Sequence, residues 1–377
     1  MPEIRLRGVT KVHPDPRRGQ VRALDALDLV VPDASLTVLT GPAGSGKTTV
    51  LRVVAGLDLV DSGRVEFDGV DVTGKPTRDR DVALVTPHSA LLPRVTVRQQ
   101  LAEALRYRQI GRREARERVM AEARALGLEP VLDRPISHLP AGDRQRVALG
   151  RALVRSPTVF LLDEPLAAVD AHERQRLRTE LSRLWRGLAT TTLYVTHDVT
   201  EAMALADQIA FLDAGRLVQL DTPQACYHRP ATALVAATIG GQAARIVDAE
   251  VADHRLRIGG IGMALTPGQR QAIGDRQRVL VAVRATSTRN AEQAGASQGV
   301  PVAATVERVV GAGPAVDLEV VLEPGGPSAP RLVTQAPPTA RLRPGDAVIV
   351  RVDIGACSIF DATDGRALHH GRVHGPA

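Results

Sequence analysis

One short segment has the residue types and spacing needed to hold a polyphosphate. It consists of Gly41, Pro42, Ala43, Gly44, Ser45, Gly46, Lys47, Thr48 and Thr49. The glycines let backbone amides turn toward phosphate oxygens, and a helix that begins here would present its positive end to the same anion. We expect the Lys47 ammonium to reach the β- and γ-phosphates and the Thr48 hydroxyl to bind Mg²⁺. The segment therefore predicts a site for a nucleoside triphosphate with Mg²⁺.

Two carboxylates and one imidazole could supply the chemistry of triphosphate hydrolysis. Asp163 and Glu164 directly follow an apolar run at 159–162. Asp163 can hold Mg²⁺ through water, and Glu164 can polarise a water molecule toward the γ-phosphate. His197 follows another apolar run and could donate a hydrogen bond to the γ-phosphate. A lone histidine at a strand end is more often structural, but its place after the two carboxylates favours a catalytic role.

The elements that must position these residues are short apolar runs separated by helical stretches. Runs at 36–40, 82–85, 159–162 and 193–196 are typical of buried strands, and each ends just before a polar cluster. A helical run at 49–57 follows the glycine-rich segment. Open α/β sheets bind ligands at the carboxyl ends of their strands. The pattern therefore predicts an α/β fold with the site along one edge of a parallel sheet.

The composition changes after about residue 233, where strand-like runs rich in Val, Gly and Pro replace the alternating pattern. We expect strands at 255–258, 279–284, 302–310, 318–322 and 347–352. Residues 97–132 favour helix and predict a small helical subdomain. The expected organisation is an α/β nucleotide-binding domain at 1–235, with its helical subdomain at about 97–150, and a small all-β barrel domain at 241–377.

Composition excludes several other classes of protein. The 377 residues are 44% hydrophobic and 24% charged, which suits two folded domains. No apolar run approaches the roughly 20 residues of a membrane-spanning helix, and the N-terminus lacks the apolar core of a secretory signal, so we expect a cytoplasmic protein. The net charge of +6 is dispersed, and aromatic residues make up only 2%, which gives nucleic-acid binding little support. Cys226 and Cys357 are too isolated for a disulfide framework or a zinc site.

The order of the motifs resembles that of the nucleotide-binding subunits of ABC transporters, specifically the importer ATPases of the maltose and glycerol-phosphate type. The matching segments are the glycine-rich loop, residues 139–147, 162–165, 168–170 and 195–198. Residues 281–284 and 359–361 are similar to the C-terminal regulatory barrel of that family, an OB- or TOBE-like domain.

This resemblance implies an ATPase that energises the uptake of a small polar solute, such as a sugar or a polyol phosphate. It implies a peripheral position on the cytoplasmic face of the membrane, bound to integral membrane permease subunits and served by a solute-binding protein. It also implies that two ATPase subunits enclose the nucleotides between them. Gly142, in the signature segment, and Asp170 are then expected to contact nucleotide across that interface.

Several residues depart from the family pattern. The signature segment, LSGGQ in the family, reads Leu139-Pro140-Ala141-Gly142-Asp143. Pro140 has neither a hydroxyl nor an N–H, and the Asp143 carboxylate would oppose a phosphate by about 1 kcal/mol or more. Alternatively, Asp143 caps a helix at 144–154. Pro87 stands where the family has a glutamine that reaches Mg²⁺, with His88 as a stand-in if the loop shifts. His13 aligns with the adenine-stacking aromatic, although an ordinary loop position is equally compatible.

Two further functions stay open, and these departures motivate the first of them. The chain could bind ATP but hydrolyse it poorly, as the partner of a better-equipped ATPase subunit. A soluble ATPase acting on DNA would share the same head fold, but it would divide that fold with long coiled-coil heptads, and residues 87–139 hold only a short helical stretch. The leading hypothesis remains an ATP-hydrolysing transporter subunit.

Overall fold

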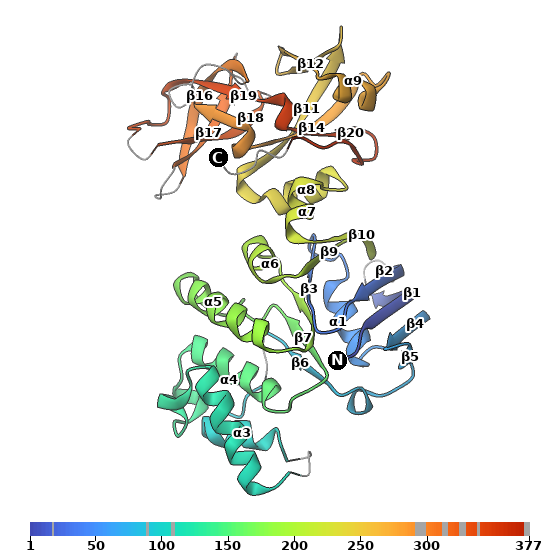
Figure 1. Ribbon diagram of the computed structural model, residues 1–377, viewed down its shortest axis with the longest axis vertical. Helices are drawn as coiled ribbons and strands as arrows, with labels where there is room; N and C mark the ends of the chain where they lie inside the picture. Colours follow the sequence, from blue (N-terminus) through green and yellow to red (C-terminus); the bar gives the residue numbers. More distant parts are fainter. Residues whose placement is uncertain are drawn as a thin grey trace. The chain divides into compact units, whose positions relative to one another are not determined.

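The computed structural model describes residues 1–16, 19–87, 90–106, 110–290, 299–310, 316–323, 329–337 and 340–372. The chain forms two compact units, Met1–Pro223 and Gln224–Ala377 (Figure 1). The first unit alternates strands and helices, whereas the second consists mainly of strands. The boundaries 1–235 and 241–377 expected for the functional domains remain predictions.

The central sheet of the first unit has the strand order β10-β9-β3-β8-β7-β6. Its strands are β3 (Leu36–Thr40), β6 (Val82–Val85), β7 (Val159–Asp163), β8 (Thr191–Val195), β9 (Gln208–Asp213) and β10 (Arg216–Asp221). All neighbouring strands from β9 to β6 are parallel, and β10 is antiparallel to β9. Every residue of β3 and β8 is buried, as expected for central strands covered on both faces.

A second, antiparallel sheet of this unit has the order β2-β1-β4-β5. It contains β1 (Ile4–Asp15), β2 (Gly19–Val31), β4 (Ser62–Phe67) and β5 (Val70–Asp71). Side chains of this sheet, of α1 (Lys47–Ala55) and of the central sheet belong to one hydrophobic core, which includes Leu6, Leu29, Val50 and Leu161. The helix that follows the glycine-rich loop is therefore held within the core.

The remaining helices of the first unit include those of the predicted helical stretch. The α-helices are α2 (Val97–Glu103), α3 (Arg112–Ala125), α4 (Ala141–Leu153), α5 (Ala171–Gly187) and α6 (Val199–Leu205), and the short 3₁₀ helices are Thr77–Asp79, Glu129–Val131 and Ile136–His138. A capping box between Thr96 and Gln99 begins α2. No helix in the described ranges is long and apolar enough to span a membrane.

The second unit is mainly β-structure, as predicted. It begins with α7 (Pro223–His228), which starts on the last residue of the first unit, and α8 (Ala233–Gly240). One sheet joins β13 (Ile261–Ala264), β12 (Arg255–Ile258), β11 (Ala244–Ala252), β14 (Arg278–Arg284), β20 (Ser358–Asp361) and β21 (Ala367–His369). The other joins β15 (Thr288–Asn290), β19 (Ala347–Val352), β16 (Val300–Val310), β17 (Val316–Leu322) and β18 (Arg331–Ala336). Short helices are α9 (Pro267–Ile273), Gly241–Ala243, Ala285–Ser287 and Ile354–Ala356.

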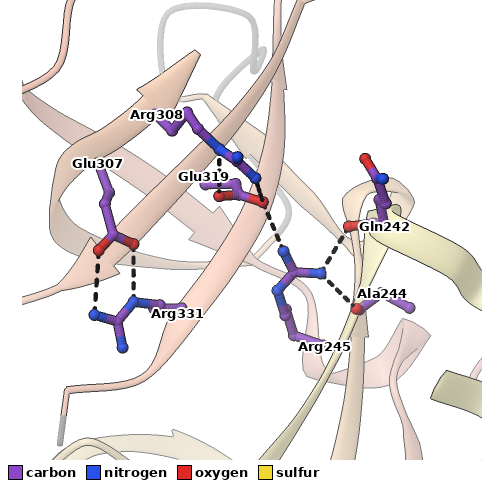
Figure 2. A network of polar contacts seen from close by, with 7 residues as sticks. All are labelled: Gln242, Ala244, Arg245, Glu307, Arg308, Glu319 and Arg331. Atoms are coloured by element: carbon purple, nitrogen blue, oxygen red, sulfur yellow. Dashed lines mark hydrogen bonds and ion pairs between the residues drawn. The ribbon is translucent and has the colours of Figure 1, made fainter. Parts of the chain in front are cut away.

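These two sheets share one core and one ion-pair network. Side chains of both sheets, among them Val281, Val320 and Val350, form a single hydrophobic cluster. At its edge, Glu319 of β17 accepts hydrogen bonds from Arg308 of β16 and from Arg245 of β11 (Figure 2). Arg245 therefore ties the first sheet to the second. The predicted barrel-like domain is confirmed as two sheets packed around a common core.

Candidate nucleotide-binding and catalytic site

The strand order of the central sheet brings several of the predicted site residues to one edge. The glycine-rich loop follows β3, His197 follows β8, Asp163 ends β7 and Pro87 follows β6. These strands are neighbours in the order β3-β8-β7-β6, and all four are parallel. Their carboxyl ends therefore meet at the same edge, where α/β sheets place ligands. Segments more than a hundred residues apart in the sequence form one site.

The loop before α1 has a backbone path that only glycine accepts at two positions. Gly41 has φ +138°, and a Cβ there would lie 2.0 Å from the backbone oxygen of Leu212. Gly46 has φ +101°, and its Cβ would lie 2.3 Å from the backbone oxygen of Ala23. Larger residues would push the loop away from the neighbouring strands. The glycines therefore let the loop close tightly against the sheet.

Lys47 points into the loop that precedes it. Its Nζ donates hydrogen bonds to the carbonyl oxygens of Gly41, at 2.9 Å, and Pro42, at 2.7 Å. Burial lowers the pKa of Lys47, while the charges of Glu164 and Asp163 act in the opposite direction. An ammonium held among carbonyl groups, with two carboxylates nearby, is positioned to bind a phosphate group that enters the loop.

The helix that carries Lys47 and Thr48 begins two residues earlier than the predicted run. It spans Lys47–Ala55, so both side chains lie in its first turn. The far end of the helix is held by Arg80, whose Nη1 donates to the carbonyl oxygens of Val53, at 2.8 Å, and Val54, at 2.9 Å. Arg80 is 4% exposed, and burial lowers its pKa. The sequence analysis did not identify Arg80, because its partners are main-chain carbonyl groups and these leave no pattern of residue types in the sequence.

Thr48 and Asp163 lie together, as a shared metal ion requires. Thr48 Oγ1 is 3.4 Å from Asp163 Oδ1. Burial raises the pKa of Asp163, while the hydrogen bond from Thr48 lowers it. A hydroxyl and a carboxylate are the hard oxygen ligands that Mg²⁺ prefers, and Mg²⁺ at such sites completes its shell with phosphate oxygens and water. The two residues fit Mg²⁺ bound together with a nucleotide.

The two predicted catalytic side chains are in direct contact. His197 Nδ1 is 3.1 Å from Glu164 Oε1. Glu164 adopts a left-handed backbone conformation with φ +45°, and its N–H donates to the Val195 carbonyl at 2.9 Å. Such a conformation costs a residue other than glycine about 1 kcal/mol or more and is common at functional sites. It turns the Glu164 side chain toward the end of β8, where His197 lies.

A buried carboxylate, absent from the sequence prediction, holds the segment on either side of His197. Glu201 of α6 is 3% exposed, and its Oε2 accepts hydrogen bonds from Tyr194 Oη and Thr196 Oγ1, both at 2.8 Å. Thr196 Oγ1 in turn accepts from the Asp198 N–H at 3.0 Å. Burial raises the pKa of Glu201, while the two hydroxyl donors lower it. These bonds anchor the residues on both sides of His197.

Two other predicted positions have simpler outcomes. His13 lies in β1, and its Nε2 is 3.5 Å from Thr49 Oγ1, which places the ring beside the first turn of α1. Its role in stacking against adenine remains a prediction. His88, the suggested stand-in for the missing glutamine, lies outside the described residues.

The prediction that Asp143 caps a helix at 144–154 is wrong. The helix α4 begins at Ala141, and Pro140 is its N-cap. Proline has a fixed φ and needs no N–H there, so it starts the helix, and its carbonyl accepts the Arg144 N–H at 3.0 Å. Asp143 therefore lies within the first turn, where its carboxylate pairs with Arg146 at 2.9 Å.

A second carboxylate lies at the beginning of α4. A Cβ on Gly142 would be 2.6 Å from the carboxyl carbon of Glu173, so this side chain covers Gly142 directly. Glu173 also pairs with Arg146 at 3.2 Å, and Asp170 caps α5 by accepting the Glu173 N–H at 3.0 Å. The positive end of α4 is thus already faced by two carboxylates of its own chain.

Comparison with known proteins identifies the family of this chain. Residues 24–167 match the family model for ABC transporters. Over 369 residues the chain is 36% identical to the xylose/arabinose import ATP-binding protein XacK of Haloferax volcanii, a match that covers 98% of this chain and 96% of that protein. It is 43% identical over 248 residues to the sn-glycerol-3-phosphate import ATP-binding protein UgpC of Rhizobium meliloti, covering 66% of this chain and 70% of that protein.

A solved structure, the dimeric post-hydrolysis state of the ATP-binding cassette MJ0796 bound to ADP and Pi, matches with a TM-score of 0.52 and 26% identity. The match covers 58% of this chain and 98% of that one. A glycine-rich loop after β3, an acidic pair at the end of β7 and a histidine after β8 define an ATPase of the phosphate-loop class. The chain belongs to the ABC transporter family as an ATP-binding subunit, and the predicted fold and ABC-type ATPase activity are confirmed.

Proposed function

We propose that this chain hydrolyses ATP to energise the import of a small polar solute, such as a sugar or a polyol phosphate. The observation that carries the proposal is the meeting of Lys47, Thr48, Asp163, Glu164 and His197 at one edge of the sheet. The relative that matches nearly the whole chain is named as an import ATP-binding protein for xylose and arabinose. The relative that matches about two thirds of the chain is named as an import ATP-binding protein for sn-glycerol 3-phosphate. The solute itself would be selected by other subunits.

Each site residue has a role in this proposal. Thr48 and Asp163 would hold Mg²⁺, which neutralises charge on the phosphates. Residues 41–49 would bind the phosphate groups, and His13 would lie against the adenine. Glu164 would orient and polarise the attacking water, and His197 would donate to the γ-phosphate and hold the Glu164 side chain. Gly142 and Asp170 would contact the nucleotide of a second ATPase subunit.

The partners follow from the same proposal. The nucleotide-binding domain, 1–235, would bind permease subunits at the cytoplasmic face of the membrane, with a solute-binding protein acting on the other side. The domain at 241–377 would be regulatory. A DNA-acting ATPase is not favoured, because α2, α3 and α4 have 7, 14 and 13 residues and supply no long coiled coil.

The structure also favours a second candidate, an ATP-binding subunit that hydrolyses slowly and pairs with a more active one. Asp143 and Glu173 present two carboxylates at the beginning of α4, where a γ-phosphate from a second subunit would need positive charge. A partner subunit with an intact signature segment would avoid this repulsion at one of the two sites. Rapid steady-state hydrolysis by the isolated chain would exclude this candidate.

The leading proposal is tested with Glu164→Gln. We expect the purified variant to lose at least about a hundredfold in turnover, since the water loses its base, while calorimetry detects unchanged ATP binding. Glu117→Gln on the exposed face of α3 is the control. In cells lacking the chain, the wild type should restore uptake of a sugar or polyol phosphate, and Glu164→Gln should not. Unaltered hydrolysis, or uptake that does not depend on the chain, would refute the proposal.

A further inference from the structure

The second unit contains a buried arginine without a counter-charge. Arg284 ends β14 and is 8% exposed. Within the described part of the chain it forms no ion pair, although other arginines of this unit, such as Arg245 and Arg276, pair with carboxylates. A guanidinium removed from water without an anion is strongly unfavourable. Its retention here indicates that something else supplies the negative charge.

The groups that contact Arg284 satisfy only part of its hydrogen-bonding capacity. The guanidinium carbon lies 4.3 Å above the centre of the Tyr227 ring, and Nη2 donates to the Tyr227 carbonyl. Its Nε is buried and has no hydrogen-bond partner among the residues that the structure describes. Arginine has five N–H donors, so holding the end of α7 accounts for one of them. A purely structural link to α7 therefore leaves the buried Nε unexplained.

The surroundings of Arg284 are basic. His228 packs edge-on against Tyr227, with 5.0 Å between the ring centres. His370, directly after β21, has a buried Nδ1 for which the described part of the chain supplies no hydrogen-bond partner. Burial lowers the pKa of His370, and the charges of His369, Arg229 and Arg284 lower it further. Three separate segments thus bring basic groups to one place.

The weak acids nearby do not balance this charge. Burial lowers the pKa of Arg284, and the nearby acids that act against this are Tyr227 and Cys357. Cys357 is buried, and this raises the pKa of its thiol to about 12, so it is neutral at physiological pH. A bound anion would supply both the missing charge and the missing acceptor.

We propose that Arg284 and His370 form a binding site for a small oxyanion, namely the phosphoryl group of inorganic phosphate or of a phosphomonoester. The oxygens of such an anion would accept from Arg284 Nε and Nη and from a protonated His370 Nδ1. His370 is partly exposed as a residue, but its Nδ1 and Arg284 Nε are buried, so an anion would reach these two atoms only after the His370 side chain moves. The site consists of residues of the second unit and shares none with the phosphate-binding loop proposed at 41–48, so it would report on a phosphorylated metabolite.

Calorimetry on the full chain tests the proposal. Lys47→Ala is introduced throughout to weaken phosphate binding at the glycine-rich loop, and Mg²⁺ is omitted. Inorganic phosphate and glycerol 3-phosphate are titrated separately. Saturable binding of both supports recognition of the phosphoryl group, and binding of the ester alone supports a phosphorylated metabolite as the ligand. The absence of saturable binding by either would overturn the proposal.

Further variants locate the binding. Arg284→Gln should weaken affinity at least tenfold, and His370→Leu severalfold, whereas Arg278→Gln is the matched control because Arg278 is an exposed arginine on the same strand. Any residual phosphate binding at the glycine-rich loop would be the same in these three variants. If a folded Arg284→Gln variant binds as tightly as the control, the site is not at Arg284. If Arg284→Gln does not fold, unchanged affinity in His370→Leu overturns the proposal by itself.

Discussion

The imidazole of His197 lies 3.1 Å from the carboxylate of Glu164, although the residues belong to different strands and loops. A proton on Nδ1 would be donated to this carboxylate in a hydrogen bond, which would fix the direction of the Glu164 side chain. The side chain of His197 is 67% exposed, so it is also accessible to a nucleotide at the edge of the sheet. One residue can therefore both orient the proposed base and sense a phosphate.

We expect His197→Ala to lower ATP turnover by about a hundredfold with little change in ATP affinity, because general-base and orienting contributions are of this order. The exposed position of His197 predicts little effect on the thermal unfolding midpoint. Turnover and calorimetric ATP binding are measured side by side. His254→Ala, an exposed histidine in the second unit, serves as control. Full activity in His197→Ala would show that the contact with Glu164 is incidental.

Asp143→Gln is expected to raise the turnover of the isolated chain about three- to tenfold. The change removes the Asp143 carboxylate from the beginning of α4, and with it a repulsion of about 1 kcal/mol against a phosphate. Arg146 keeps its ion pairs with Glu173 and Glu180. Initial rates at saturating ATP are compared with those of Glu103→Gln, an exposed carboxylate on α2. A rate at or below that of the wild type would mean that Asp143 does not oppose catalysis.

The nucleotide-free protein should lose stability as the pH rises through the titration of Asp163. Burial raises the pKa of this carboxyl in the folded state above its unfolded value of about 4. The carboxyl therefore contributes favourably to the free energy of unfolding below the unfolded-state pKa, and this contribution is lost as the pH rises through the folded-state pKa. Asp163→Asn should remove this dependence and raise the unfolding midpoint at neutral pH, although Mg-ATP hydrolysis is lost. Thermal unfolding from acidic to neutral pH measures the difference, and parallel curves for wild type and variant would contradict it.

Removal of the buried Glu201 carboxylate should destabilise the first unit. Glu201→Ala leaves the hydroxyls of Tyr194 and Thr196 without their acceptor, at a cost of about 2–4 kcal/mol in the free energy of unfolding. Denaturant unfolding gives the value, with Glu180→Ala on the more exposed face of α5 for comparison. Equal stability of the two variants would show that the hydroxyls find other partners.

The candidate nucleotide site was recognisable from the sequence, and its chemistry remains a prediction. Residues 41–48 and the pair Asp163 and Glu164 are short, contiguous motifs, and a motif between a strand and a helix requires only local geometry. Buried strands such as Val82–Val85 are continuous apolar runs and were found at their observed positions. The change from α/β to mainly β-structure likewise follows from local composition.

Other features depend on contacts between distant segments and had no local signal. The parallel order β3-β8-β7-β6 decides that Glu164 meets His197. Arg80 and Glu201 are recognised as positioning residues only in the folded protein. Arg80 is recognised by the carbonyl groups to which it donates, and Glu201 by the hydroxyl groups from which it accepts.

The sequence by itself determined which residues are predicted to bind phosphate and activate water, since those predictions follow from residue type and local spacing. Only the tertiary structure decided which charges are paired. It directs Asp143 and Glu173 to Arg146 at the start of α4 and leaves Arg284 buried without a carboxylate within the described residues. The physical reason is that the energy of a charge depends on its burial and on neighbours brought to it by the fold, and neither is encoded in a short stretch of chain.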